Sequence, residues 1–457
     1  MSRRTTKTKR PPTVHVVSLG CPKNLVDSEQ MCGQLGAAGF AFTNAPDEAN
    51  VLLINTCGFI EPACEEARAE IRDAIAWKRR KRGRRIAVAG CWVQRFGERA
   101  AREFPEIDLL LDLNAVPDAA RRIQQSLTKP GNPASGLRGD EASYLADHTV
   151  PRLLLTPPSY AYLKIADGCD HHCRFCTIPA IRGRQRSRYM DSIRAEAQSL
   201  LDCGVRELNL IAQDTTRYGV DLANGADLAT LLRELDSLGG EFWVRLLYTH
   251  PAYFSEDVVA AMAECERVVP YVDLPLQHIS DSVLTAMGRR TPAADIRTLL
   301  HRLRTAIPDI ALRTTFLVGY PGETEADFEE LLGFVEETRF QRLGCFAFCP
   351  EEGTPAAKAH AHDPVPTEIA DERRDRIMAL QQTLATETNR AMLGDERIVL
   401  VDGLDEDGAV RARTTMDAPE IDDSVILSSD EVAPTPDFHR VRIVDATAYD
   451  LVAELSA

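Results

Sequence analysis

The sequence of 457 residues predicts an α/β protein in three parts: a doubly wound α/β domain, a partial TIM-like barrel of six βα units, and a small C-terminal β-barrel. Three observations predict this fold. Short apolar runs alternate with helical stretches up to about Leu127, and six further strand-like runs alternate with helices from Tyr160 to about Phe348. Short strands between Asp, Gly and Pro turns follow from Arg390. The predicted boundaries are 13–127, 160–389 and 390–457, with a linker over 128–159.

Composition and charge restrict the class of protein. The 53 Lys and Arg residues against 69 Asp and Glu give a net charge of −16, and no apolar run approaches the length of a membrane span. Residues 1–12 are basic without the apolar stretch of a secretory signal, so we interpret them as a disordered tail. Twelve cysteines without such a signal favour the reducing cytoplasm, where metal ligation is more common than disulfide formation.

Each of the first three apolar runs is followed by a cysteine. The runs are Val14–Val17, Val51–Ile54 and Ile86–Ala89, and the cysteines are Cys21, Cys57 and Cys91. Continuous apolar runs of this length are typical of parallel strands that are buried on both faces. Because ligands in open α/β sheets bind at the carboxyl ends of strands, the three thiols can converge although they are distant in sequence. The sequence therefore predicts a three-thiolate site here, and the alternative is three buried, unreactive cysteines.

The predicted linker is rich in Pro, Gly and Asp and shows little periodicity. We expect one short strand within it, at Arg152–Leu155. The basic run from Lys78 to Arg85 follows a helical stretch, and we interpret it as a solvated helix end, with nucleic-acid contact as the alternative.

A second cysteine triplet follows the first strand of the predicted barrel. Cys169, Cys173 and Cys176 are spaced C-x3-C-x2-C. Thiolates are soft ligands suited to iron–sulfur clusters, zinc and Cu(I). Three thiolates on a [4Fe–4S] cluster would leave one iron open to a small molecule. The alternative is structural zinc with a histidine, His171 or His172, as the fourth ligand.

Polar and glycine residues follow the other predicted barrel strands, where the chemistry of such barrels is found. The six strand-like runs are Ala161–Ala166, Glu207–Ile211, Phe242–Leu247, Tyr271–Leu274, Ala311–Val318 and Leu343–Phe348. The residues that follow them are Gln213, Asp214, His250, Gln277, His278, Gly319, Gly322 and Glu323. Each is a weak signal alone, since a glycine pair can simply make a turn and a histidine can simply be hydrogen-bonded. Their expected place on one rim makes them candidates as a group.

The C-terminal part is strongly acidic. Its predicted strands are Ile398–Val401, Ala409–Arg413, Ser424–Leu427 and Val441–Val444. Six arginines stand against sixteen Asp and Glu residues from Arg390 onward, which gives a charge of about −10. Such a module suits a basic protein partner better than a phosphate-rich one.

Both triplets and the motifs around them resemble a known family. The C-x3-C-x2-C spacing is the signature of the radical S-adenosylmethionine (radical SAM) superfamily, whose open iron binds SAM and cleaves it reductively to a 5′-deoxyadenosyl radical. From about Val14 onward the chain resembles the radical SAM methylthiotransferase family. The segments that carry this resemblance are Ser18–Asn24, Asn55–Ile60, Ile211–Asp214 and Leu274–His278. The resemblance implies an auxiliary [4Fe–4S] cluster in the first domain, a radical SAM barrel, and a C-terminal TRAM barrel.

Within this family the chain is similar to the branch that modifies a ribosomal protein. The resemblance implies methylthiolation at Cβ of one aspartate in small-subunit ribosomal protein number twelve. It implies two [4Fe–4S] clusters, with SAM bound at the cluster of the second triplet and sulfur held at the cluster of the first. The residues on the barrel rim would be the SAM contacts, and a reductant such as flavodoxin or ferredoxin would supply electrons.

Two alternatives remain open, of which the second belongs to another functional class. A tRNA methylthiotransferase would carry the same clusters, but the acidic C-terminal part makes direct tRNA binding unfavourable. A non-catalytic iron–sulfur electron carrier or sensor would not require a barrel of six βα units.

Overall fold

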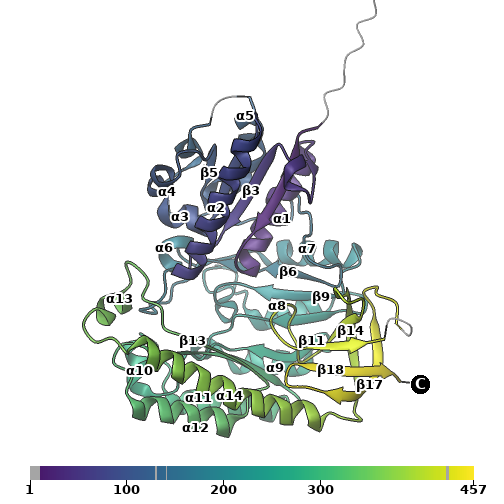
Figure 1. Cartoon of the computed structure of the whole chain (residues 1–457). Coiled ribbons are helices and arrows are strands. Elements are labelled where there is room, and N and C mark those ends of the chain that lie inside the picture. The colour runs from purple at the N-terminus through teal and green to yellow at the C-terminus, as the bar shows by residue number, and fades with distance from the viewer. Residues whose placement is uncertain (1–10, 129–130, 140, 429–431, 457) are drawn as a thin grey trace, which may run out of the picture. The chain divides into compact units, whose positions relative to one another are not determined.

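The computed structural model describes residues 11–128, 131–139, 141–428 and 432–456 (Figure 1). These residues form two compact units. Unit 1 comprises Met1–Leu155 and Ile178–Gly183, and unit 2 comprises Thr156–Thr177 and Arg184–Ala457. The predicted tail lies almost wholly outside the described residues. Within the described ranges, no helix is long and apolar enough to cross a membrane.

Unit 1 is the predicted doubly wound α/β domain. Its five parallel strands lie in the order β2-β1-β3-β4-β5. The strands are β1 (Thr13–Ser18), β2 (Ala41–Phe42), β3 (Val51–Thr56), β4 (Arg85–Gly90) and β5 (Leu109–Leu111). The α-helices are α1 (Pro22–Ala37), α2 (Glu61–Arg80), α3 (Cys91–Phe96), α4 (Glu98–Glu103), α5 (Ala119–Ser126) and α6 (Ile178–Arg182). The 3-10 helices are η1 (Pro46–Glu48), η2 (Leu113–Asp118) and η3 (Pro133–Gly136).

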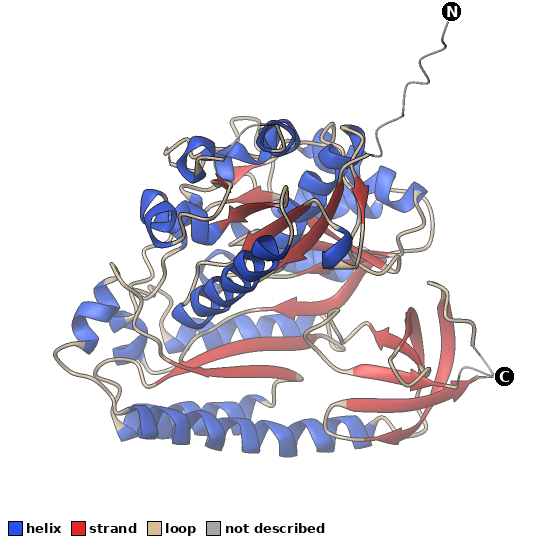
Figure 2. Cartoon of the chain, turned by 45° about the horizontal axis from the view of Figure 1, so that its top comes forward, coloured by secondary structure: helices blue, strands red, loops and turns tan. Residues whose placement is uncertain are grey.

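Alternate side chains of the central strands enter two separate cores. Leu53 of β3 packs with α1 and α5, whereas its neighbours Leu52 and Ile54 pack with α2, α3 and α4. Helices therefore cover both faces of this sheet (Figure 2), which is why apolar residues stand next to one another in its central strands instead of alternating with polar ones. In this strand order the winding reverses between β1 and β3, and doubly wound sheets bind ligands at the carboxyl ends of strands at such a switch point.

The predicted strand at Arg152–Leu155 is wrong. This stretch runs along α1, where the Arg152 side chain donates to the Glu29 carboxylate at 2.6 and 2.8 Å. The amide of Leu153 donates to the Glu29 carbonyl at 3.0 Å, and the amide of Leu155 donates to the Glu29 carboxylate at 2.8 Å. Because Glu29 accepts the backbone donors that a strand would have placed in a ladder, these residues stay extended without joining a sheet.

Unit 2 contains the predicted partial barrel of six parallel strands, in the order β13-β12-β11-β10-β9-β6. All six predicted runs are confirmed as β6 (Tyr160–Lys164), β9 (Glu207–Ile211), β10 (Trp243–Leu246), β11 (Val268–Asp273), β12 (Ala311–Val318) and β13 (Arg342–Ala347). A short ribbon pairs β7 (Ala166–Asp167) with β8 (Arg186–Ser187). The helices are α7 (Met190–Asp202), η4 (Thr215–Arg217), α8 (Leu228–Asp236), η5 (Pro251–Tyr253), α9 (Glu256–Glu264), α10 (Asp281–Ala286), α11 (Ala293–Ala306), α12 (Glu325–Thr338), α13 (Pro355–His360) and α14 (Thr367–Ala391).

The C-terminal part of unit 2 is a closed β-barrel in the order β14-β15-β16-β18-β17. Its strands are β14 (Glu396–Leu404), β15 (Val410–Thr414), β16 (Ser424–Leu427), β17 (Phe438–Ala446) and β18 (Asp450–Leu455). The four predicted strands are confirmed, and β18 was not predicted. Leu451 and Ala453 of β18 alternate into the barrel core, and this strand closes the barrel by pairing with both β16 and β17.

Buried charges join the six-stranded sheet to the small barrel. Glu207 of β9 is completely buried and lies 2.6 Å from both Arg245 of β10 and Arg413 of β15. Arg313 of β12 pairs with Asp422 at 3.1 Å. Glu207 begins β9 and Arg313 lies near the start of β12, so these two charges are at the amino ends of their strands, away from the carboxyl ends that carry the cysteine loop. The charges that burial would otherwise penalise are thus paired across the two sheets.

Candidate metal centres

Three cysteines of unit 1, Cys21, Cys57 and Cys91, follow the carboxyl ends of β1, β3 and β4. A Cβ atom at Gly20 would lie only 2.8 Å from the Cβ of Cys57, so the loop that carries Cys21 touches Cys57 directly. Burial raises the pKa of the Cys91 thiol to about 12; the Arg182 charge opposes the rise, and negative charge at Cys21 and Cys57 adds to it. The three thiols therefore lie in one electrostatic environment, at the switch point of the sheet.

Glycines let the loops of this site approach one another closely. Gly90 has a φ of +99°, and a Cβ there would lie 2.3 Å from the side-chain oxygen of Asn55. A Cβ at Gly58 would lie 2.7 Å from the backbone of Trp92. Any larger residue at these two positions would separate the Cys57 loop from the start of α3, where Cys91 lies.

A buried polar group that sequence analysis missed also lies at this site. Arg182 of α6 donates from Nη2 to Asn24 Oδ1 at 3.0 Å, to Asp27 Oδ2 at 2.9 Å and to Cys91 Sγ at 3.3 Å. No sequence rule points to it, because Arg182 is 91 residues from Cys91 and the only local signal is a basic residue shortly after Cys176.

The second triplet lies on the loop that follows β6 and β7 in unit 2. Gly168 begins the loop with a φ of +84°, and its amide donates to Asp167 at 2.9 Å. The predicted residue Gln213 donates its side-chain amide to the same Asp167 oxygen at 2.8 Å. Gln213 therefore fixes the start of the cysteine loop to the end of β9.

The cysteine loop contacts the end of α10. The amide of Arg174 donates to the carbonyl of Met287 at 2.9 Å, and a Cβ at Gly288 would lie 2.8 Å from the carbonyl of His172. Phe175 packs against the apolar cluster that contains Met287 and Tyr320. The residues between the cysteines thus hold the loop in place, and the cysteines need not do so.

Positive charge and backbone donors face the thiols of this loop. The amide of His171 contacts Cys169 Sγ at 3.4 Å. Burial raises the pKa of the Cys169 thiol to about 12, and the His171 amide opposes that rise. Burial lowers the pKa of the Arg289 guanidinium, while negative charge at all three cysteines opposes that shift. Arg289 was not among the predicted site residues, because nothing in Gly288–Arg290 marks it apart from an ordinary helix end.

Two of the predicted rim residues, Asp214 and His250, lie beside the same loop. The Asp214 carboxylate is 2.6 Å from His171 Nε2, and the His171 ring stacks on the His250 ring at 4.2 Å and 12°. His250 Nδ1 accepts the Ala252 amide at 3.2 Å, and Arg289 contacts His250 Nε2 at 3.1 Å. Burial and the Arg289 charge lower the pKa of His250, which keeps this imidazole neutral.

The remaining predicted rim residues form a separate, mostly buried group. His278 is completely buried, its Nδ1 accepts the Ser280 amide at 3.0 Å, and its Nε2 lies 4.0 Å from the Glu323 carboxylate. Burial lowers the pKa of His278 to about 4 and raises the pKa of Glu323 to about 7. Arg373 of α14 opposes the shift of Glu323, to which it donates at 2.9 Å.

Three of the predicted rim residues, Gln277, Gly319 and Gly322, are explained by backbone conformation or close packing. Gln277 has a φ of +71° and extends the pairing of β11 with β12, because its amide donates to the Thr315 carbonyl at 2.8 Å. A Cβ at Gly319 would lie 2.4 Å from the Cβ of Ala370, and Gly322 has a φ of +82°. These contacts explain the residue types by packing, and SAM contact at these positions stays a prediction.

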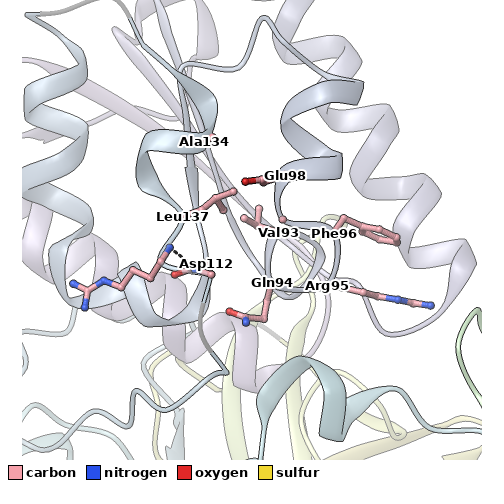
Figure 3. Close-up of a pocket in the computed structure, with 11 residues that line it drawn as sticks. Val93, Gln94, Arg95, Phe96, Glu98, Asp112, Ala134 and Leu137 are labelled. Atoms are coloured by element: carbon pink, nitrogen blue, oxygen red, sulfur yellow. Dashed lines mark hydrogen bonds between the residues drawn. The ribbon is translucent and has the colours of Figure 1, made fainter.

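Unit 1 also contains a polar cavity of about 370 Å³ one helical turn beyond Cys91 (Figure 3). Gln94 at its wall accepts the Leu113 amide at 3.0 Å. Asp112 accepts the amides of Arg138 and Gly139 through one carboxylate oxygen, and its other oxygen is buried without a hydrogen-bond partner. The polar groups at this wall mainly hold η2 and the following loop together.

The donor sets of both triplets fit iron–sulfur clusters. Thiolates are the ligands of such clusters, and N–H donors near the sulfurs stabilise their negative charge. Cys169 faces the His171 amide, Cys91 faces Arg182, and the amides of Gly58 and Phe59 lower the pKa of Cys57 against the larger effect of burial. Among the described side chains, no three His, Cys, Asp or Glu residues converge as closely as a single metal ion requires.

Comparison with known proteins covers nearly the whole chain. Three family models match in order: Uncharacterized protein family UPF0004 over residues 13–112, the Radical SAM superfamily over 163–335 and the TRAM domain over 393–455. A protein of Akkermansia muciniphila is 44% identical over 97% of this chain and 100% of its own length. Its counterparts in Syntrophus aciditrophicus and Anaeromyxobacter sp. are 43% and 46% identical, covering 98% and 97% of this chain and 99% and 93% of their own lengths. All three are named ribosomal protein uS12 methylthiotransferase RimO.

The chain belongs to the RimO family. Membership of this family confirms the predicted radical SAM methylthiotransferase, an enzyme that uses SAM and iron–sulfur chemistry, over a zinc protein or a non-catalytic carrier. The radical SAM model spans Cys169, Cys173 and Cys176, and the UPF0004 model spans Cys21, Cys57 and Cys91. The TRAM model spans the closed C-terminal barrel, as predicted.

Solved structures outside the RimO family share the fold. The radical SAM methyltransferase TsrM from Kitasatospora setae, with cobalamin and a [4Fe–4S] cluster bound, matches with a TM-score of 0.55 at 15% identity over 76% of this chain and 77% of its own. The cobalamin-dependent radical enzyme OxsB matches with a TM-score of 0.53 at 13% identity over 81% of this chain and 56% of its own. At these identities the likeness shows the architecture alone.

Proposed function

We propose that this chain adds a methylthio group to Cβ of an aspartate in ribosomal protein uS12. The proposal is supported by one observation: this chain of the RimO family has two cysteine triplets, and each lies on loops at the carboxyl ends of parallel strands. The activity for which the relatives are named supplies the substrate, and the resemblance of the motifs supplies the aspartate Cβ.

The second triplet would hold one [4Fe–4S] cluster with SAM at its open iron. An unactivated C–H bond is beyond any side-chain base, so the cofactor supplies the radical chemistry when it is bound. The chain's own part is to place the thiolates: Gln213 holds the start of the loop, and the end of α10 holds its middle. Asp214 and His250 fix the ring of His171, between the first two thiols.

The first triplet would hold the auxiliary [4Fe–4S] cluster, which makes two clusters per chain. Its three thiols lie at the switch point of a doubly wound sheet, where these sheets bind their ligands. Holding sulfur there for transfer is a different task from cleaving SAM, and separate sites allow each to be tuned by its own neighbours. Arg182 is the charged neighbour of the first site, and Arg289 is the charged neighbour of the second.

The proposed partners are uS12 and a small reductant such as flavodoxin or ferredoxin, without direct binding of tRNA. The acidity of the C-terminal barrel supports a basic protein partner, although part of that charge is internal. Asp417, Asp422 and Asp423 neutralise arginines of the six-stranded sheet. The exposed acids Glu406 and Asp407 lie on the turn between β14 and β15, where a partner can reach them.

The decisive experiment compares the ribosomes and tRNA of a strain with and without this gene. Mass spectrometry should find uS12 methylthiolated at an aspartate in the parent, unmodified in the deletion strain, and modified again when the wild-type gene is returned. The tRNA of the two strains should not differ in methylthio content. An unchanged uS12 peptide together with loss of methylthiolated tRNA would instead establish the tRNA-modifying alternative.

A further inference from the structure

Arg182 has an environment that an ordinary structural arginine does not need. Its side chain is 2% exposed, and its Nη2 atom lies within 3.3 Å of a carboxylate oxygen, an amide oxygen and a thiol sulfur. Asp27 supplies the opposite charge that a buried guanidinium requires. Charge pairing does not require the sulfur contact. The nitrogen that binds Asp27, Nη2, also donates to Cys91 Sγ.

A second buried ion pair on α1 shows what pairing alone looks like. Glu29 lies two residues after Asp27, is completely buried, and binds Arg152 at 2.6 Å. This pair fixes the extended stretch that follows Arg152, because Glu29 also accepts the amide of Leu155. The chain therefore offers a matched comparison: two buried arginine–carboxylate pairs on one helix, of which one touches a thiol.

Asn24 connects Arg182 to the other two thiol-bearing loops. The Asn24 amide nitrogen donates to the carbonyl of Leu19 at 3.0 Å and to the carbonyl of Thr56 at 2.8 Å. Leu19 lies two residues before Cys21, and Thr56 directly precedes Cys57. Because the Asn24 oxygen accepts from Arg182, one hydrogen-bonded chain runs from the Cys21 and Cys57 loops to the Cys91 sulfur.

The helix that carries Arg182 is itself fixed against the first triplet. Ile181 of α6 is completely buried in a cluster with Cys91 and Leu113. Gly183 follows Arg182 with a φ of +70°, which ends the helix. In the sequence Arg182 comes six residues after Cys176, so the segment that leaves the second triplet ends at a sulfur ligand of the first.

We propose that Arg182 is a positioning residue of the auxiliary site, which orients the Cys91 thiolate and raises the reduction potential of the cluster on Cys21, Cys57 and Cys91. The inference deepens the proposed function and rests on it. Hydrogen bonds and positive charge at a ligating sulfur favour the more negative, reduced state of a cluster, and neighbours that orient a ligand also slow the loss of the metal.

The test isolates the auxiliary cluster in the full-length chain. Cys169, Cys173 and Cys176 are changed to Ala, and Arg182→Gln, Arg182→Lys or the control Arg152→Gln is added to that background. Two quantities are measured after anaerobic reconstitution: the midpoint potential by redox titration with electron paramagnetic resonance, and the rate of iron loss to a chelator. Circular dichroism and thermal unfolding report whether each variant is folded.

We expect Arg182→Gln to shift the midpoint potential to a more negative value and to speed iron loss by about tenfold or more, in the range found for residues that orient metal ligands. Arg182→Lys keeps the charge and loses the forked geometry, so it should restore most of the potential while iron loss stays faster than in the background. Arg152→Gln should lower the unfolding temperature without moving the potential, because this guanidinium pairs with Glu29 rather than with Asp27 beside Cys91.

Each outcome bears on a different statement. A folded Arg182→Gln variant with unchanged potential and unchanged iron loss overturns the role of Arg182 and leaves the proposed function intact. Background protein that retains no iron overturns the auxiliary site itself, and with it the proposed function. If Arg182→Gln does not fold, Arg182→Lys decides, since iron loss equal to that of the background contradicts the inference.

Discussion

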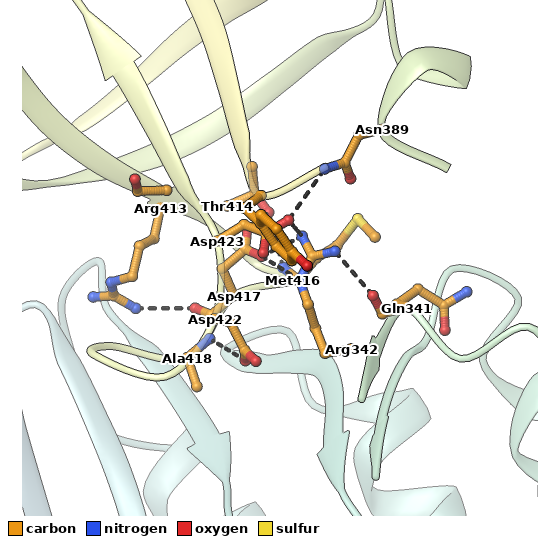
Figure 4. A network of polar contacts seen from close by, with 12 residues as sticks. Gln341, Arg342, Asn389, Arg413, Thr414, Met416, Asp417, Ala418, Asp422 and Asp423 are labelled. Atoms are coloured by element: carbon orange, nitrogen blue, oxygen red, sulfur yellow. Dashed lines mark hydrogen bonds and ion pairs between the residues drawn. The ribbon is translucent and has the colours of Figure 1, made fainter. Parts of the chain in front are cut away.

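Arg342, the first residue of β13, donates to the Asp417 carboxylate of the C-terminal barrel from Nε at 2.9 Å and from Nη2 at 2.5 Å (Figure 4). Both side chains are almost completely buried. Asp423 lies 3.2 Å from the same guanidinium and accepts the Asn389 side chain of α14 at 3.1 Å. A buried charge that loses its partner is strongly destabilising, so this contact fastens the small barrel to the six-stranded sheet.

The first prediction concerns that contact. Asp417→Asn should destabilise the protein by about 3–5 kcal/mol, because the buried Arg342 guanidinium loses the carboxylate oxygen that accepts from both Nε and Nη2. The control is Asp395→Asn, which removes the half-exposed partner of Arg397 and should cost at most about 1 kcal/mol. Thermal unfolding under anaerobic conditions measures both. Equal unfolding temperatures for the two variants would contradict the fastening role of Arg342 and Asp417.

The second prediction concerns pH. Burial raises the pKa of Asp423 to about 7; Arg342 opposes the rise and Asp417 adds to it. Since the folded pKa lies above the unfolded value of about 4, stability from this group is fully present below about pH 4 and is lost as pH rises to about 7. Asp423→Asn copies the neutral form and removes this dependence.

Wild-type stability relative to Asp423→Asn should therefore fall between pH 5 and pH 8, by about 2 kcal/mol after allowance for relaxation around the buried carboxylate. Unfolding temperatures of both proteins across this range give the difference. A variant that loses more stability at pH 8 than at pH 5 would show that attraction to Arg342 outweighs burial.

The third prediction concerns cluster number. Anaerobically reconstituted protein should hold about eight irons per chain, the sum of two four-iron clusters. Changing Cys169, Cys173 and Cys176 to Ala should remove about half of the iron, because the thiols of unit 1 are untouched. Elemental analysis and iron assays measure this, with Cys203→Ala, an exposed cysteine outside both triplets, as the control. Full retention of iron, or zinc in its place, would refute the assignment.

The fourth prediction separates the tasks of the two triplets. A chain in which Cys21, Cys57 and Cys91 are Ala should still cleave SAM under strong reductant, because the open-site motif lies in unit 2. It should form no methylthiolated product, because sulfur transfer is assigned to the auxiliary site. Chromatography of 5′-deoxyadenosine and mass spectrometry of uS12 distinguish the two. Product from this triple variant would show that sulfur comes from elsewhere.

What the sequence predicts well is local or follows from topology. Most strands of the two parallel sheets are mainly apolar runs, and a cysteine in the loop that follows such a run must lie at the carboxyl edge of its sheet. That reasoning places all six cysteines without knowledge of any contact. Strand β18 was not predicted from the sequence. It forms because it closes the barrel, and closure depends on its partners β16 and β17 rather than on its own six residues.

What the sequence does not predict depends on distant partners. Arg182 is important for its contact with the Cys91 sulfur and Arg289 for its charge beside the second triplet, and nothing in their neighbourhoods distinguishes them from arginines at ordinary helix ends. Glu29 removes the predicted strand at Arg152–Leu155 through contacts more than 120 residues apart in the chain. The composition of the C-terminal barrel likewise does not tell which acidic residues are exposed and which pair with arginines of the six-stranded sheet.

The last prediction uses that distinction to test the partner. Asp405 is unsuitable for charge reversal, because its carboxylate accepts the amides of Asp407 and Ala409 and pairs with Arg411 at 2.8 Å. Glu406 and Asp407 are exposed on the same turn. Changing both to Lys should slow association with uS12 several-fold at low salt and leave SAM cleavage without substrate unchanged, because exposed charges steer encounter.

The effect should shrink as salt rises, since ions screen exposed charges beyond about 8 Å at physiological ionic strength. The matched control reverses Glu330 and Glu336, two exposed acids on α12, and should slow association less if the turn between β14 and β15 faces the partner. Association rates of the wild type and both variants are measured against uS12 and against unmodified tRNA across a salt series.

Because phosphate is repelled by the surface that attracts a basic protein, the reversal should strengthen tRNA binding while it weakens uS12 binding. Tighter wild-type binding to tRNA than to uS12 would reject the protein partner and support the tRNA-modifying alternative.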